Sequence, residues 1–205
     1  MSETLKIYGD CRSGNCLKVR WTADHLGVDY EWVEIDVVSG STRTDEFLKL
    51  NPSGQVPAVV LPDGRTLSQS NAIVVYLAGL SNSALLPEDL YLRAKANEWL
   101  FWEQYSHEPF IAVRRAQLTL YRKSEADLDP QLLAKGRRAL GQMEMQLSKS
   151  DYLVGDKVTV ADIALVAYTR VAPEGGFDLS EFPAVRGWIA RVERDLAIPP
   201  FEEAA

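Results

Sequence analysis

The chain has 205 residues, 46% of them hydrophobic, and a formal net charge of −7, which is the composition of an ordinary packed protein long enough for two modest domains. The negative charge disfavours nucleic acid and anionic membranes as partners, because its long-range field repels phosphate. The N-terminus lacks a basic region followed by an apolar run, and no stretch approaches the ~18 uninterrupted apolar residues of a membrane span, so we expect a soluble, cytoplasmic protein.

The first part of the chain alternates strand and helix signals. Apolar and β-branched runs indicate strands, and apolar residues at helical spacing indicate helices, the first of which ends near Gly27 as a C-terminal cap. A right-handed crossover after that helix makes the first two strands parallel. In chain order the pattern predicts a strand over 5–8, a helix over 16–27, a strand over 30–35, a short helix over 44–50, strands over 58–61 and 66–68 joined as a hairpin, and a helix through 73–80.

Beyond this part the strand signals stop. Long periodic runs predict helices over about 90–120, 129–147, 159–171 and 183–196. We therefore predict an α+β chain: a β-α-β-α-β-β-α domain over 1–80, a linker over 81–88, and an all-helical domain over 89–205.

The first candidate site is Ser13-Gly14-Asn15-Cys16, where the first strand meets the first helix. Free backbone N–H groups and the positive end of the helix dipole favour an anion such as a thiolate there. A hydroxyl of Ser13 or an amide of Asn15 that donates to the sulfur lowers a thiol pKa. The alternative is that Ser13 or Asn15 only caps the helix.

The two cysteines, Cys11 and Cys16, are too few for a disulfide scaffold and are not spaced as a C-x-x-C redox pair, which disfavours dithiol chemistry. Cys16 lies on the predicted buried face of the helix and is expected to be a core residue. The two histidines, His25 and His107, are far apart, so we expect no metal site.

Two further motifs follow. Val56-Pro57 precedes a strand expected to be central, where a proline removes a hydrogen-bond donor from the sheet and so calls for an explanation. A cis bond there leaves the backbone of Val56 available to pair with a peptide-like ligand. The alternative is an ordinary trans proline that enters an edge strand. Gln69-Ser70 opens the third helix and offers an anion site suited to an α-carboxylate, or else Ser70 simply caps that helix.

The segment Thr159-Val160-Ala161-Asp162 reads as a capping box with Asp at its third helical position. Such a cap is worth about 1 kcal/mol. We assign it to the folding of the helical domain and not to chemistry.

With these motifs in place, the chain resembles the cytosolic glutathione transferases over essentially its whole length. The matching stretches are 13–20, 51–57, 69–73 and 159–162. The resemblance implies a thioredoxin-like N-terminal domain, an all-helical C-terminal domain and a homodimer, with glutathione as co-substrate. It points to the serine-dependent theta-like or zeta-like classes or to the nu-like bacterial class, because Tyr8 lies within the strand and no N-terminal tyrosine stands where the alpha, mu and pi classes use one. The zeta-like Ser-Ser-Cys run is missing, which argues against a maleylacetoacetate isomerase.

By position, the resemblance implies a role for each site residue. Ser13 corresponds to the catalytic serine of the theta and zeta classes, and Asn15 falls where nu-class members place an asparagine near the thiol. The expected glutathione contacts are the Val56 backbone for the cysteinyl unit beside the cis-proline Pro57, Gln69 and Ser70 for the γ-glutamyl unit, and Gln55 and Arg43 for the glycine carboxylate.

These roles predict an enzyme that ionises the glutathione thiol for attack on a small electrophile. The alternatives are glutathione-dependent reduction of peroxides or disulfides, and a non-catalytic glutathione-binding scaffold. The electrophile is expected against the long helix of the second domain, although an aromatic stripe of this kind is also typical of a core. That helix carries Trp102, Tyr105, His107, Phe110 and Arg114.

Overall fold

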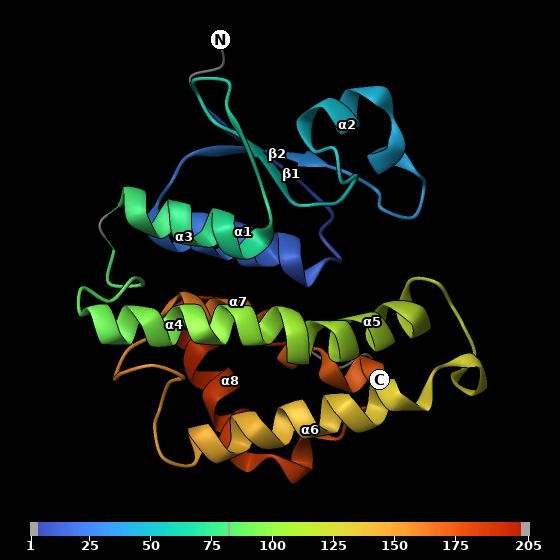
Figure 1. Cartoon of the computed structure of the whole chain (residues 1–205), viewed down its shortest axis with the longest axis vertical. Helices are drawn as coiled ribbons and strands as arrows, with labels where there is room; N and C mark the ends of the chain where they lie inside the picture. The colour runs from blue at the N-terminus through green and yellow to red at the C-terminus, as the bar shows by residue number, and fades with distance from the viewer. Residues whose placement is uncertain (1–3, 82, 202–205) are drawn as a thin grey trace. The chain divides into compact units, whose positions relative to one another are not determined.

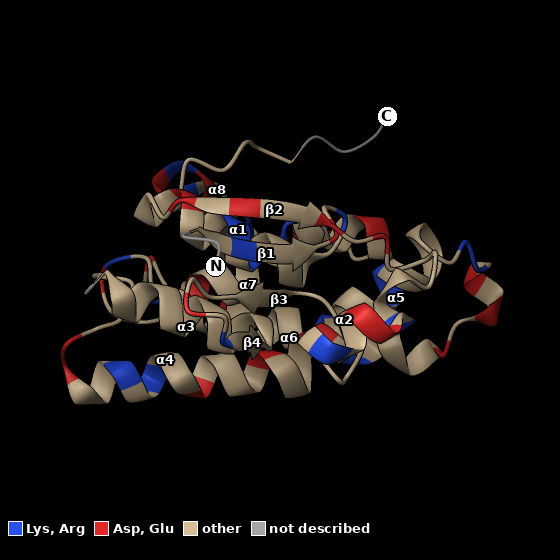
Figure 2. Cartoon of the chain, turned by 90° about the horizontal axis from the view of Figure 1, so that it is seen from above, with Lys and Arg blue, Asp and Glu red and all other residues tan. Residues whose placement is uncertain are grey.

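The computed structural model describes residues 4–81 and 83–201. The chain divides into two compact units, Met1–Ser83 and Ala84–Ala205, which are described separately. The extreme N-terminus and residue 82 of the expected linker lie outside the described residues. Basic and acidic residues are interspersed on several elements, for example along α4 (Figure 2).

The N-terminal unit is a four-stranded mixed sheet with helices on its faces (Figure 1). The strand order is β2-β1-β3-β4, in which β1 runs parallel to β2 and antiparallel to β3, and β3 runs antiparallel to β4. This confirms the predicted parallel pair, the hairpin and the central position of the strand that follows Pro57. The elements are β1 Leu5–Gly9, α1 Gly14–Leu26, β2 Tyr30–Glu34, the 3₁₀ turn η1 Ser41–Arg43, α2 Asp45–Leu50, β3 Ala58–Val60, β4 Thr66–Ser68 and α3 Ser70–Leu80.

Alternation along β1 sets the two faces of this sheet. Ile7 is fully buried, whereas Tyr8 meets Phe47 of α2 edge to face, with ring centroids 6.5 Å apart. Helices α1 and α3 pack side by side on one face, and α2 lies on the other (Figure 1). Helix α1 ends as predicted at Gly27, whose left-handed φ of 64° suits a residue without a Cβ. The N-termini of α1 and α3 are thereby held next to the same sheet.

The C-terminal unit is all-helical in its described residues, which together with the mixed sheet confirms the expected α+β class. Helix α7 is buried along its whole length, and α4, α5 and α8 pack around it. No helix in the described ranges has the length and apolar character that a membrane crossing requires. The elements are α4 Leu90–Trp102, the π-helical segment η2 Glu103–His107, α5 Glu108–Thr119, α6 Pro130–Leu147, α7 Val160–Thr169 and α8 Pro183–Asp195, with 3₁₀ turns η3 Glu125–Asp127, η4 Ala172–Gly175 and η5 Leu179–Glu181.

One predicted helix differs from the structure. The run expected to be continuous over 90–120 is interrupted by η2, in which the N–H of Glu108 bonds to the carbonyl of Glu103, five residues earlier. Pro109 follows immediately and has no N–H to donate to the carbonyl of Tyr105, so the α-helical ladder cannot pass this point unchanged. The spacing of apolar residues in the sequence does not by itself reveal that the helix widens to π-helical geometry at this point.

The predicted capping box is confirmed at the start of α7. The Thr159 hydroxyl accepts from the helix backbone, and the Asp162 carboxylate accepts from the Thr159 N–H at 2.8 Å. The fully buried Asp162 also accepts from the Leu153 N–H at 3.0 Å and from the Trp188 indole N–H at 2.8 Å. The carboxylate therefore joins the helix cap to the preceding loop and to α8.

Candidate functional site

Ser13 stands at the junction of β1 and α1, as predicted. It is the N-cap residue, with φ −87° and ψ 118°, but its side chain makes no capping hydrogen bond. Its hydroxyl is near enough to the Cys16 thiol to act on the pKa of that thiol, in the lowering direction. Simple helix capping therefore does not account for the Ser13 hydroxyl.

Cys16 is a buried core residue, as its helical spacing indicated. Burial raises the pKa of its thiol to about 11, although hydrogen bonds from the Ser13 hydroxyl and the Asp10 N–H act in the opposite direction. The Asp10 N–H lies 3.4 Å from the sulfur. Cys16 is consequently a neutral thiol near neutral pH and not a nucleophile.

The loop that enters α1 is held by an ion pair that the sequence analysis missed. The buried carboxylate of Asp10 accepts from the Arg12 guanidinium at 2.7 and 2.9 Å and from the Val37 N–H at 3.1 Å. Burial favours the neutral carboxyl, but these hydrogen bonds outweigh it and hold the pKa of Asp10 below its ordinary value of 3.8. Arg12 also bonds to Asp36 at 2.7 Å. The only sequence signal was an Asp directly after an apolar strand.

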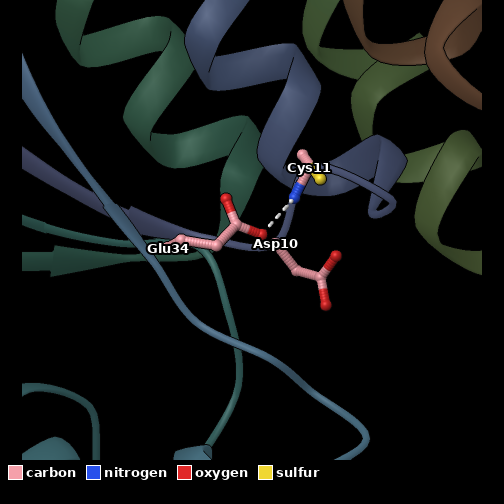
Figure 3. A group of neighbouring side chains, drawn as sticks. All are labelled: Asp10, Cys11 and Glu34. Carbon is pink, nitrogen blue, oxygen red and sulfur yellow. Dashed lines mark hydrogen bonds between the residues drawn. The ribbon is translucent and has the colours of Figure 1, made fainter.

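Cys11, in the same loop, is exposed, and its backbone N–H donates to Glu34 at 3.0 Å (Figure 3). Partial burial and the nearby Glu34 carboxylate raise the pKa of its thiol. Potential ligand atoms of Asp10, Cys11 and Glu34 lie within 4.8 Å of one another. Both carboxylates, however, already accept hydrogen bonds, Asp10 as described and Glu34 from Cys11 and from the Trp32 indole at 2.6 Å. The two carboxylates are thus already used to hold the loop that enters α1.

Asn15 connects the two predicted anion sites. Its side-chain oxygen accepts from the Ser70 hydroxyl at 3.0 Å, across 55 residues of sequence, and from the Lys18 ammonium at 2.8 Å. Ser70 is the first residue of α3 and is buried. The N-termini of α1 and α3 therefore meet at one point through the side chains of Asn15 and Ser70. Lys18 was not among the predicted site residues.

Gln69, not Ser70, is the N-cap residue of α3, and it makes no side-chain capping bond. It is exposed, with φ 70° and ψ 111°. A non-glycine residue in this backbone region is strained, and such strain is concentrated at ligand-binding positions. Simple capping by Ser70 is accordingly not what the structure contains.

The peptide bond between Val56 and Pro57 is cis, as predicted. Val56 is half-buried and precedes β3. Within the described part of the chain its backbone N–H and C=O bond to no other protein group. The backbone of Val56 therefore retains its capacity to pair with an extended ligand.

The two residues expected at the glycine carboxylate lie at one loop. The Arg43 guanidinium donates to the Ser53 carbonyl at 3.3 Å and covers Gly54, where an added Cβ would lie 2.5 Å from Nη1. Gln55 is exposed, and its carbonyl accepts from the Asn51 amide at 2.7 Å. No hydrogen bond or ion pair among the described residues joins this loop to Ser13, Asn15 or Ser70.

The residues expected along the long helix of the second domain differ in exposure, and η2 interrupts their helical spacing. His107 and Arg114 are buried and bond within their own unit, His107 to the Thr169 hydroxyl at 2.9 Å and Arg114 to the Gly175 carbonyl at 2.7 Å. Tyr105 is 83% exposed. Of the remaining two, Trp102 donates to Gln142 and Phe110 lies under Lys135. The two buried residues are therefore structural.

Comparisons with known proteins point to the same family for the N-terminal and the C-terminal parts of the chain. Residues 12–80 match the family model for the glutathione S-transferase N-terminal domain, and residues 101–195 match that for the C-terminal domain. The chain is 31% identical over 194 residues to glutathione S-transferase 3 of Zea mays, covering 90% of this chain and 86% of that protein.

Two solved structures are similar along nearly the full length. A glutathione S-transferase from Pseudomonas fluorescens has a TM-score of 0.89 and 44% identity, covering 97% of this chain and 98% of that one. Ure2p in complex with glutathione has a TM-score of 0.86 and 28% identity, covering 95% of this chain and 93% of that one.

Proposed function

The chain belongs to the glutathione S-transferase family, and from that membership we propose that it binds glutathione and joins the tripeptide, through its thiol sulfur, to small electrophilic molecules. The domain over 1–80 holds glutathione, and the helical domain over 89–205 supplies the surface for the electrophile. The thiol loses its proton to solvent, and the thiolate forms a C–S bond by addition or by displacement of a leaving group. Proximity and stabilisation of the thiolate account for most of the rate.

The observation that carries this proposal is the 3.0 Å hydrogen bond between Ser70 and Asn15. It brings together two helix N-termini, each of which favours negative charge. Glutathione carries an anionic sulfur and anionic carboxylates on one extended peptide, so two adjacent anion sites suit it. A strained N-cap at Gln69 and the unpaired backbone of Val56 support the same ligand.

Each site residue has a proposed role. Ser13 is the chief donor to the thiolate, and Asn15 is a second donor. The Val56 backbone pairs with the cysteinyl unit next to Pro57, Gln69 and Ser70 hold the γ-glutamyl unit, and Gln55 and Arg43 bind the glycine carboxylate.

Replacement of Ser13 by Ala tests the assignment. A charge-assisted hydrogen bond is worth about 1.5–3 kcal/mol, so Ser13→Ala should raise the pKa of bound glutathione and lower turnover by about tenfold to a hundredfold. Glutathione affinity should change less, because the other contacts remain. Thiolate absorbance measured against pH gives the thiol pKa, and Asn15→Ala is the matched variant. A Ser13→Ala protein that titrates like the wild type while Asn15→Ala shifts would transfer the main role to Asn15.

The substrates that the protein turns over distinguish the two alternative functions from the proposed one. The raised thiol pKa values of Cys11 and Cys16 leave the protein without an activated cysteine, so reduction of a peroxide or mixed disulfide would also depend on the glutathione thiol. The scaffold alternative rests on the likeness to Ure2p, one structure of which is described as a nitrogen regulation fragment of a yeast prion protein. Turnover of a chloronitroarene, a hydroperoxide and a glutathione disulfide should be compared with calorimetric glutathione binding. Binding of glutathione without turnover of any of these substrates would refute the proposed enzymatic function.

We propose that the protein is a homodimer. Four large apolar side chains are more than 70% exposed, two at the start of α4 and two at its end and in η2, and such exposed apolar surface supports an interface. These residues are Leu90, Tyr91, Phe101 and Tyr105. Light scattering at micromolar concentration should give twice the chain mass, and Phe101→Asp should give the monomer mass; a wild-type monomer would contradict the proposal.

The proposed location is the cytoplasm. Both cysteines are free thiols, and the cytosol is the compartment that keeps thiols reduced. Fractionation of cells that produce the protein should recover it with cytosolic markers, and recovery with a membrane or secreted fraction would contradict this location.

A further inference from the structure

Lys18 is the one fully buried lysine among the described residues, and it lies beside the candidate site. Its ammonium is 2.8 Å from the side-chain oxygen of Asn15 and 3.5 Å from that of Asn71. A buried ammonium is unfavourable unless hydrogen bonds replace its water. An apolar residue would avoid this desolvation cost, so the ammonium calls for an explanation in terms of the groups that it contacts.

The ammonium determines which way the Asn15 amide faces. An ammonium has three donors and no acceptor, so the Asn15 atom that it contacts must be the carbonyl oxygen. The Ser70 hydroxyl donates to the same oxygen at 3.0 Å. With Oδ1 turned toward Lys18 and Ser70, the Nδ2 group is at the opposite end of the amide. A flipped amide would place N–H donors against an ammonium, which is unfavourable.

Ser70 cannot hold this orientation when ligand is bound. A serine hydroxyl has one proton. If that proton is donated to the γ-glutamyl carboxylate, as the proposed function requires, it is no longer donated to Asn15. Lys18, with its three protons, still donates to the oxygen.

We propose that Lys18 is a positioning residue for thiol activation. It holds the Asn15 amide with its NH₂ group directed to the glutathione sulfur while Ser70 binds the carboxylate. The positive charge on the oxygen side also polarises the amide, which strengthens its N–H donors. Lys18 does not itself contact the substrate, and this inference rests on the proposed binding of glutathione at Ser70 and Asn15.

A double-mutant cycle on the thiol pKa of bound glutathione tests the inference. Lys18→Met removes the ammonium and leaves an apolar side chain of similar length, which suits a buried position. It should raise the thiol pKa by about one unit, a tenfold loss of thiolate near neutral pH. Asn15→Ala should produce a similar rise, and the double variant should show no further rise, because Lys18 acts only through Asn15. Lys49→Met, at an exposed position of α2, is the matched control and should titrate like the wild type.

A second variant avoids dependence on how well Lys18→Met folds. Asn15→Asp retains an acceptor for Lys18 but has no N–H to donate, so it should keep the fold and raise the thiol pKa at least as much as Asn15→Ala. A Lys18→Met protein with the wild-type thiol pKa overturns the inference, as do additive effects in the cycle or a wild-type thiol pKa in Asn15→Asp. A wild-type protein that binds no glutathione instead overturns the proposed function.

Discussion

Replacement of Asp162 by Ala should be among the most destabilising single changes in the helical unit. The buried carboxylate accepts four hydrogen bonds, from the N–H and hydroxyl of Thr159, the N–H of Leu153 and the indole of Trp188. Alanine removes the acceptor for all of them and leaves only the Thr159 half of the capping box at the start of α7. Leu153, Thr159 and Trp188 are themselves buried, so water does not replace the lost oxygen atoms.

The expected loss of stability follows from the number of buried hydrogen-bond donors that lose their acceptor. A buried donor without a partner costs about 1–3 kcal/mol. The wild-type carboxylate is itself unfavourable to bury, and this burial raises the pKa of Asp162, so part of the loss is recovered when the carboxylate is removed. The expected loss is about 3–5 kcal/mol of the free energy of unfolding, a large share of the ~5–15 kcal/mol of a typical domain.

Urea unfolding at fixed protein concentration measures this loss. Asp129→Ala is the matched control, because Asp129 caps α6 through a 2.9 Å bond from the Gln131 N–H but is exposed. It should lose only about 1 kcal/mol. Equal losses in the two variants, at equal dependence of the free energy on urea, would show that the buried network contributes nothing beyond an ordinary cap and would refute the reasoning.

Three further predictions concern packing, thiol reactivity and pH. Gly136→Ala should destabilise the protein by about 1–3 kcal/mol in urea unfolding, because its Cβ would lie 2.4 Å from the buried ring of Phe177. Gly141→Ala on the same helix meets no other atom and should stabilise the protein by about 1 kcal/mol. A change of the free energy of unfolding in the same direction for both variants would contradict this reasoning. A thiol reagent at neutral pH should modify Cys11 in the native protein, at a rate below that of a free thiol because its pKa is raised, and Cys16 only after unfolding; modification of two thiols in the native protein would disprove the burial argument. The lowered pKa of Asp10 makes its stabilisation complete above about pH 4 and lost as the pH falls through the folded value, so the urea midpoints of wild type and Asp10→Asn should differ at neutral pH and converge in acid; a constant difference would exclude this linkage.

Much of the fold follows from signals within short stretches of the sequence. Alternation and helical spacing identify the strands and helices, and Gly27 and Asp162 mark a helix end and a helix start through chemistry that spans only a few residues. The proline before a central strand likewise pointed to the cis bond at Val56-Pro57. Candidate site residues at the starts of α1 and α3 could be named because a helix N-terminus favours anions wherever it lies.

The sequence alone determined the order of the elements, their caps and the candidate residues at each helix start, since these depend on neighbours along the chain. Only the tertiary structure brought Asn15 to Ser70, buried Lys18 under α3 and joined Asp10 to the N–H of Val37 after β2. In a sequence, a lysine on a helix reads as a surface residue, and its burial depends on what the packing of α1 against α3 places over it. Contacts of this kind join segments far apart in the chain, and no local period or propensity encodes which distant side chain will supply the partner.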